Sequence, residues 1–136
     1  MTGEHMPYES VTRENIETMV FDFYGIVLKD EMLAPFFIKA LGENLEGGKW
    51  HEHLGTLKDF WVLMMTGKAG YRGDPFPAHA FLGALTRETF ERWLMLFKEV
   101  VYRLYTPEIA QRFYQKADIL AEQFIDNLGL DEDDDW

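Results

Sequence analysis

The sequence contains no cysteine among its 136 residues. This absence excludes a disulfide framework, a zinc site built on thiolates and an iron–sulfur cluster. Basic residues are also scarce, since 13 Lys and Arg stand against 24 Asp and Glu, for a net charge of −11. The five acids of residues 131–135 account for less than half of that charge. We therefore expect neither nucleic acids nor anionic membrane surfaces as partners.

Long hydrophobic runs are missing as well. The first ten residues include Glu4, Pro7 and Glu9, and no window approaches the roughly 18 apolar residues of a membrane span. A soluble cytoplasmic protein is the resulting expectation. Aromatic residues, in contrast, are abundant, with 11 Phe, 6 Tyr and 4 Trp in a chain that is 47% hydrophobic. A chain of this length and composition can form one domain with a large aromatic core.

Hydrophobic spacing predicts four long helices. Thr12 and Thr86 are suitable N-caps for the first and third of them. Gly67 and Gly129 are suitable residues to end the second and fourth. Apolar residues recur at intervals of three and four in residues 13–29, 49–66, 87–104 and 107–128.

Shorter elements lie between the long helices. Residues 30–42 carry Pro35 and predict short helical turns, and residues 74–82 predict a short helix with a proline at its first position. No hairpin turn or sustained period-two run occurs, so we expect an all-α fold. The predicted division of the chain is an N-terminal extension over 1–12, one domain over 13–130 and an acidic tail over 131–136.

The run His51-Glu52-His53 invites a metal-site interpretation that helix geometry rejects. Two residues that are two positions apart on a helix point about 160° away from each other. The two histidines therefore cannot share one ion, and the spacing also differs from the zinc-protease pattern. His53 lies three residues after Trp50 and four before Leu57, which predicts an inward position, whereas His51 is expected to face solvent.

His79 lies on the predicted short helix, between Phe76-Pro77 and Phe81. So short a helix contributes little stability alone, and packing or a bound group is expected to hold it. One imidazole cannot chelate a metal, but it suffices as the axial ligand of a haem, whose macrocycle supplies the other ligands. A haem would also explain the aromatic excess, with a tight cofactor-free core as the alternative.

Three further residues offer polar hydrogens on apolar helix faces. They are Tyr24, His53 and Trp93. A buried donor without a partner costs about 1–3 kcal/mol, so three such donors need a common explanation. Dioxygen on ferrous iron carries partial negative charge, which preorganised O–H and N–H donors stabilise. The three residues thus predict a polar pocket for a diatomic ligand.

Several stretches occur together, in a fixed order, over roughly residues 14 to 125. They are Phe23-Tyr24 with Val27, Lys29 and Asp30; Pro35 with Phe37; Trp50-His51-Glu52-His53 followed by Phe60-Trp61; Tyr71-Arg72-Gly73-Asp74-Pro75 leading to His79; and Phe90-Glu91-Arg92-Trp93-Leu94 with Leu96-Phe97. In this combination the sequence resembles the truncated haemoglobins, and within them group III. The resemblance implies the two-over-two helical sandwich, a shortened globin fold around a haem.

The resemblance also implies roles for individual residues. It makes His79 the proximal ligand of a haem b iron. The distal donors that it implies are Tyr24, His53 and Trp93. The further cofactor contacts that it implies are Phe37, Leu57, Tyr71 and Arg72, with the last two as candidate partners of the haem propionates.

The function that follows is the binding of dioxygen, nitric oxide or another diatomic ligand. A cage of three donors slows ligand release, which suits nitric oxide dioxygenase-like or peroxidase-like chemistry better than oxygen transport. No flavin or dinucleotide fingerprint occurs in the sequence, so a catalytic cycle would need an external reductase. The alternative function is a cofactor-free helical interaction module whose acidic surface binds a basic partner. A non-haem metal site is disfavoured because His53 and His79 have no evident third ligand.

Overall fold

The computed structural model describes residues 6–67 and 86–127. Within these ranges every regular element is a helix, as the sequence predicts. The helices are α1 (Arg13–Val27), α2 (Ala34–Leu41), α3 (Gly48–Thr66), α5 (Arg87–Leu104) and α6 (Pro107–Asn127). No helix of the described ranges is both long and apolar enough to cross a membrane. The predicted short helix of residues 74–82 and the acidic tail of residues 131–136 lie outside the described residues.

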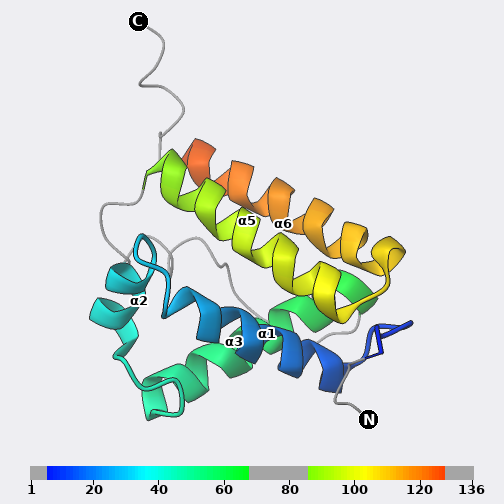
Figure 1. Ribbon diagram of the computed structural model, residues 1–136, viewed down its shortest axis with the longest axis horizontal. Helices are drawn as coiled ribbons and strands as arrows, with labels where there is room; N and C mark the ends of the chain where they lie inside the picture. Colours follow the sequence, from blue (N-terminus) through cyan, green and yellow to red (C-terminus); the bar gives the residue numbers. More distant parts are fainter. Residues whose placement is uncertain (1–5, 68–85, 128–136) are drawn as a thin grey trace, which may run out of the picture.

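The long helices form two antiparallel pairs (Figure 1). Helices α1 and α3 run in opposite directions in one layer, and α5 and α6 do so in the other. Helix α1 packs against α5, which joins the layers, and the short α2 lies beyond the C-terminal end of α1. This is the two-over-two arrangement that the resemblance implies.

Local signals set the ends of the helices. The Thr12 hydroxyl accepts a hydrogen bond from the Asn15 backbone N–H, and the Asn15 side chain accepts one from the Thr12 N–H, both at 3.0 Å. This capping box opens α1. Gly67 ends α3 with φ of 78°, a left-handed conformation that glycine adopts without strain. Helix α1 ends at Val27, two residues before its predicted end, because the chain turns there.

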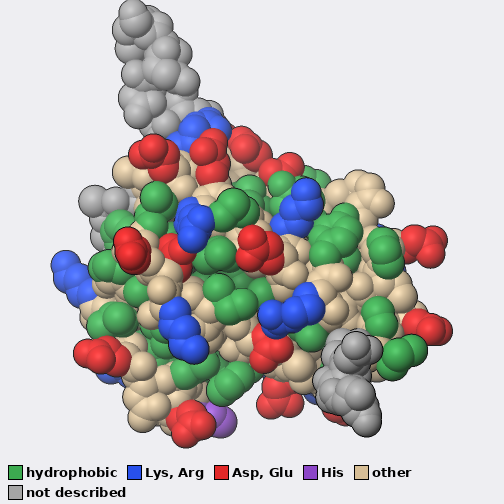
Figure 2. Space-filling view, viewed as in Figure 1, with side chains coloured by type: hydrophobic (Ala, Val, Ile, Leu, Met, Phe, Trp, Pro, Cys, Tyr) green, Lys and Arg blue, Asp and Glu red, His purple; other side chains and the backbone are tan. Residues whose placement is uncertain are grey.

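An aromatic core fills the space between the layers. Phe97 of α5 is 1% exposed, and its ring centroid lies 5.3 Å from that of Phe23 in α1 and 5.2 Å from that of Trp61 in α3. Phe113 of α6 lies 6.5 Å away. One ring therefore contacts rings from every other long helix. On the face in Figure 2, acidic and basic side chains alternate with apolar ones.

The chain before α1 packs on the turn between α5 and α6. Tyr8 forms an isolated parallel bridge with Tyr105, in which the Tyr8 N–H donates to the Leu104 carbonyl at 2.8 Å and its carbonyl accepts from the Thr106 N–H at 3.0 Å. The Tyr105 hydroxyl donates to Asn15 Oδ1 at 2.9 Å. Because Asn15 also belongs to the capping box, this bond connects the start of α1 to the end of α5.

Replacing Tyr105 with Phe should destabilise the fold by about 1 kcal/mol, since one buried hydrogen bond is lost while the ring remains. The free energy of unfolding is measured by urea denaturation. Tyr102, which is 41% exposed, supplies the matched control. Tyr102→Phe should change the free energy of unfolding by less than about 0.5 kcal/mol. Equal effects of the two substitutions would contradict the role of the Tyr105 hydroxyl.

Candidate functional site

Tyr24 is the centre of an aromatic cluster built by three helices. Its side chain lies on α1 and is 3% exposed. Ring centroids lie 5.5 Å from Phe37 in α2, 5.6 Å from Trp50 in α3 and 5.9 Å from His53 in α3. The fold thus brings together three residues predicted to share a pocket, namely Tyr24, His53 and Phe37.

Trp93, the third predicted donor, approaches Tyr24 from α5. Its indole N–H, which can only donate, lies close enough to the Tyr24 hydroxyl to lower the pKa of that group. The Trp93 ring stacks on Phe97 at 5.4 Å with an interplanar angle of 1° and meets Phe23 edge-on at 5.4 Å. Trp93 is half-buried. Its indole is therefore held by core residues while its polar edge faces the tyrosine.

The environment of Tyr24 fixes its protonation state. Burial raises the pKa of Tyr24 to about 12, because the phenolate form would lose its hydration, and the hydrogen bond from Trp93 offsets part of that effect. The hydroxyl is therefore protonated at neutral pH. Its hydrogen can therefore be donated to an acceptor.

The two neighbouring histidines occupy different environments, as helix geometry predicts. His51 is exposed. His53 is half-buried, its Nε2 atom is shielded from solvent, and its ring packs against Trp50 at 5.6 Å as well as against Tyr24. His53 is thus a second nitrogen-bearing side chain in the Tyr24 cluster.

Trp50 was not expected to belong to the site. It is 0% exposed, stacks on Phe37 at 6.1 Å and donates from Nε1 to the Gly42 carbonyl at 2.8 Å. This bond ties α3 to the end of α2. The sequence signal was its position three residues before His53, which places both side chains on one helix face. Trp50 therefore packs against Tyr24, Phe37 and His53.

The remaining predicted residues are placed only in part. Leu57, one turn after His53, is half-buried and packs against the core. His79, Tyr71 and Arg72 lie outside the described residues. Over the ranges that the structure does describe, no three His, Asp or Glu side chains gather as a metal-binding group.

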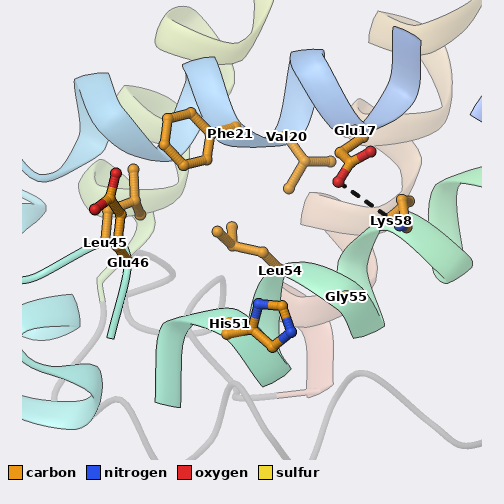
Figure 3. A pocket seen from close by; sticks show the side chains of 9 residues that line it. All are labelled: Glu17, Val20, Phe21, Leu45, Glu46, His51, Leu54, Gly55 and Lys58. Carbon is orange, nitrogen blue, oxygen red and sulfur yellow. Dashed lines mark ion pairs between the residues drawn. The ribbon is translucent and has the colours of Figure 1, made fainter. Parts of the chain in front are cut away.

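A separate pocket of about 350 Å³ opens at the surface between α1 and α3 (Figure 3). In the close-up, Val20 of α1 points toward Leu54 of α3. Lys58 and Glu17 form an ion pair across it at 3.9 Å. Tyr24, His53 and Trp93 are not among its lining residues, so it is distinct from the Tyr24 cluster. The lining residues are Glu17, Val20, Phe21, Leu45, Glu46, His51, Leu54, Gly55 and Lys58.

Two comparisons with known proteins indicate the same family. The chain is 34% identical over 123 residues to the group 3 truncated hemoglobin ctb of Campylobacter jejuni, covering 90% of this chain and 95% of that protein. The crystal structure of the group III truncated hemoglobin from Campylobacter jejuni matches with a TM-score of 0.83 at 34% identity, over 90% of this chain and 95% of that one. No protein-family model matches the sequence.

The raised pKa of Tyr24 predicts a loss of stability at alkaline pH. The unfolded chain releases this proton near pH 10 and the folded chain near pH 12, so the contribution is complete below pH 10 and falls as pH rises between these values. Between pH 9 and pH 11 the wild type should lose about 1 kcal/mol more free energy of unfolding than Tyr24→Phe. Urea denaturation at each pH measures the difference, and parallel pH profiles would contradict the burial of an ionisable phenol.

Proposed function

This chain belongs to the group III truncated haemoglobin family, and on that premise we propose that it binds haem b and takes dioxygen or nitric oxide as a ligand. The observation that carries the proposal is the cluster in which the buried Tyr24 lies beside His53, with Trp93 approaching from α5. Polar hydrogens gathered in an apolar environment suit a small ligand that develops negative charge. A cofactor-free interaction module would not require this arrangement.

The residues of the chain fit a haem in their chemistry. When bound, haem supplies an iron centre at which diatomic molecules bind. His79 would hold the iron through its imidazole, and Tyr71 and Arg72 would pair with the propionates. Phe37 and Leu57 would contact the macrocycle, because both side chains are apolar. Phe37 packs against Tyr24, and Leu57 lies one helical turn after His53.

The distal residues would act mainly by donating hydrogen bonds. Tyr24 keeps its proton at neutral pH and can donate it in a hydrogen bond to a bound ligand. Trp93 orients the hydroxyl by occupying its oxygen, and His53 offers a ring N–H from the opposite helix. Trp50 and Phe37 keep water from the cluster, which strengthens these electrostatic interactions.

Hydrogen-bond donors around a bound ligand would slow its release. Slow release favours a reaction of bound dioxygen over dioxygen transport. We include the oxidation of nitric oxide to nitrate in the proposal, a reaction that consumes one nitric oxide, one dioxygen and one electron. The electron must come from outside, because the sequence carries no flavin or dinucleotide fingerprint. An external reductase is therefore part of the proposed function.

Haem uptake and the role of His79 are tested together. Wild type reconstituted with haemin should show a Soret band at about 400–420 nm, and failure to form one would contradict the proposal. His79→Gly should lose stable coordination and regain it with added imidazole. His51→Ala removes an exposed histidine and serves as the control. A ferrous spectrum of His79→Gly identical to that of wild type would contradict the assignment of His79.

Replacing Tyr24 with Phe removes one donor worth about 1–2 kcal/mol, which corresponds to dioxygen release about five- to thirtyfold faster. Stopped-flow displacement measures the rate, with the exposed Tyr102→Phe as control. Mixing dioxygen-equilibrated wild type with nitric oxide should produce nitrate, with a lower yield for Tyr24→Phe. An unchanged dissociation rate would make Tyr24 a structural residue, and the absence of nitrate would contradict the nitric oxide reaction.

A further inference from the structure

An ion pair with a buried carboxylate joins the corner between α1 and α2 to helix α5. Asp30 Oδ1 accepts from Arg92 Nε at 2.7 Å and from Arg92 Nη2 at 2.6 Å. The other carboxylate oxygen, Oδ2, accepts from the backbone N–H groups of Met32 at 3.1 Å and Leu33 at 3.0 Å. A single side chain therefore bonds to the turn before α2 and to a helix 62 residues away in sequence.

The Asp30 backbone continues the same connection. Its N–H donates to the Val27 carbonyl at 3.1 Å, and its carbonyl accepts from the Ala34 N–H at 2.9 Å. Asp30 is thus bonded to the last residue of α1 and the first residue of α2. Any movement of α5 relative to this corner must stretch the bond to Arg92.

The carboxylate of this pair is more deeply buried than any partner of the other ion pairs in the described ranges. The Asp30 side chain is 4% exposed and that of Arg92 is 38% exposed, whereas both partners of the pair between Arg103 and Asp22 are 37% or more exposed. Exposed pairs contribute little to stability, but a carboxylate withdrawn from water depends on its partners. Although burial alone would raise the pKa of Asp30, Arg92 and the two backbone N–H groups hold that pKa below its usual range.

Each of the three elements tied together at Asp30 carries a residue in or beside the Tyr24 cluster. Helix α1 carries Tyr24, α2 carries Phe37, and α5 carries Trp93 directly after Arg92. Trp93 of α5 and Tyr24 of α1 both pack edge-on against Phe23, with ring centroids 5.4 Å and 4.7 Å from it. A shift of α5 along α1 would separate these two donors, since a hydrogen bond weakens steeply with distance and angle.

We propose that Asp30 and Arg92 are positioning residues of the distal site, and that their ion pair fixes the register of α5 against the α1–α2 corner so that Trp93 lies beside Tyr24. The effect on the position of Trp93 relative to Tyr24 follows from the ion pair and from the packing of both side chains on Phe23. The effect on dioxygen release rests on the proposed function.

The first test replaces Asp30 with Asn, which keeps the shape and an oxygen for the backbone N–H groups but removes the charge. Dioxygen release from Asp30→Asn should be about three- to tenfold faster, the size of coupling expected through a neighbouring contact. Asp22→Asn breaks the exposed pair with Arg103 and is the matched control, expected to change the rate less than about twofold. Equal rates for Asp30→Asn and wild type would overturn the inference.

A double-mutant cycle separates positioning from general loss of stability. With Trp93 replaced by Phe the donor is already absent, so Asp30→Asn should then add no further acceleration. Full additivity of the two substitutions would overturn the inference.

The Arg92 side of the ion pair offers a third test. Arg92→Lys keeps the charge and should release dioxygen more slowly than Arg92→Gln. The reverse order would contradict the positioning role of the ion pair.

A measurement that needs no haem keeps this inference apart from the proposed function. The Trp93 indole N–H resonance, assigned by its loss in Trp93→Phe, reports the surroundings of that N–H beside Tyr24 in protein without added haemin. It should shift in Asp30→Asn, because the position of Trp93 relative to Tyr24 changes, and remain in place in Asp22→Asn. An unmoved resonance in Asp30→Asn would overturn the positioning role even if haem binds, whereas failure of wild type to take up haemin would overturn the proposed function alone.

Discussion

The packing of Phe97 is the contact on which the rest of the structure depends. Its ring meets Phe23 of α1, Trp61 of α3 and Phe113 of α6, so it fixes α5 relative to every other long helix. Trp93 stacks on the same ring one turn earlier, at an interplanar angle of 1°. The indole ring of Trp93 is therefore held against the core by packing that lies outside the Tyr24 cluster.

Burial has two linked consequences for Tyr24. The apolar surroundings disfavour the phenolate, which raises the pKa to about 12 and keeps the hydroxyl as a donor. The same surroundings remove competing water, so a hydrogen bond from that hydroxyl is stronger than in solution. The high aromatic content thus does more than fill space, because Phe37 and Trp50 create the environment in which one phenol becomes an effective donor.

Much of the fold could be predicted from local patterns, because helix spans depend on periodicity and caps. Thr12 and Gly67 act as predicted, and helix geometry separates His51 from His53 correctly. Contacts between helices could not be predicted in this way. Periodicity shows which face of a helix is apolar but not which residue of another helix lies opposite. The Asp30–Arg92 pair joins positions 62 residues apart, which no local pattern reveals.

The use of a charged pair at this corner, in place of another apolar contact, has a physical reason. Apolar packing is nearly non-directional, so a contact such as that of Phe97 in α5 with Phe23 in α1 does not by itself select one register. A buried ion pair seldom stabilises a fold more than well-packed apolar residues, but it is satisfied in only one register. Asp30 accepts from Arg92 and from two backbone N–H groups at once, so a shift of α5 leaves a buried carboxylate short of donors. Aromatic packing therefore stabilises the contact between α1 and α5. The ion pair selects the alignment at which Trp93 lies beside Tyr24.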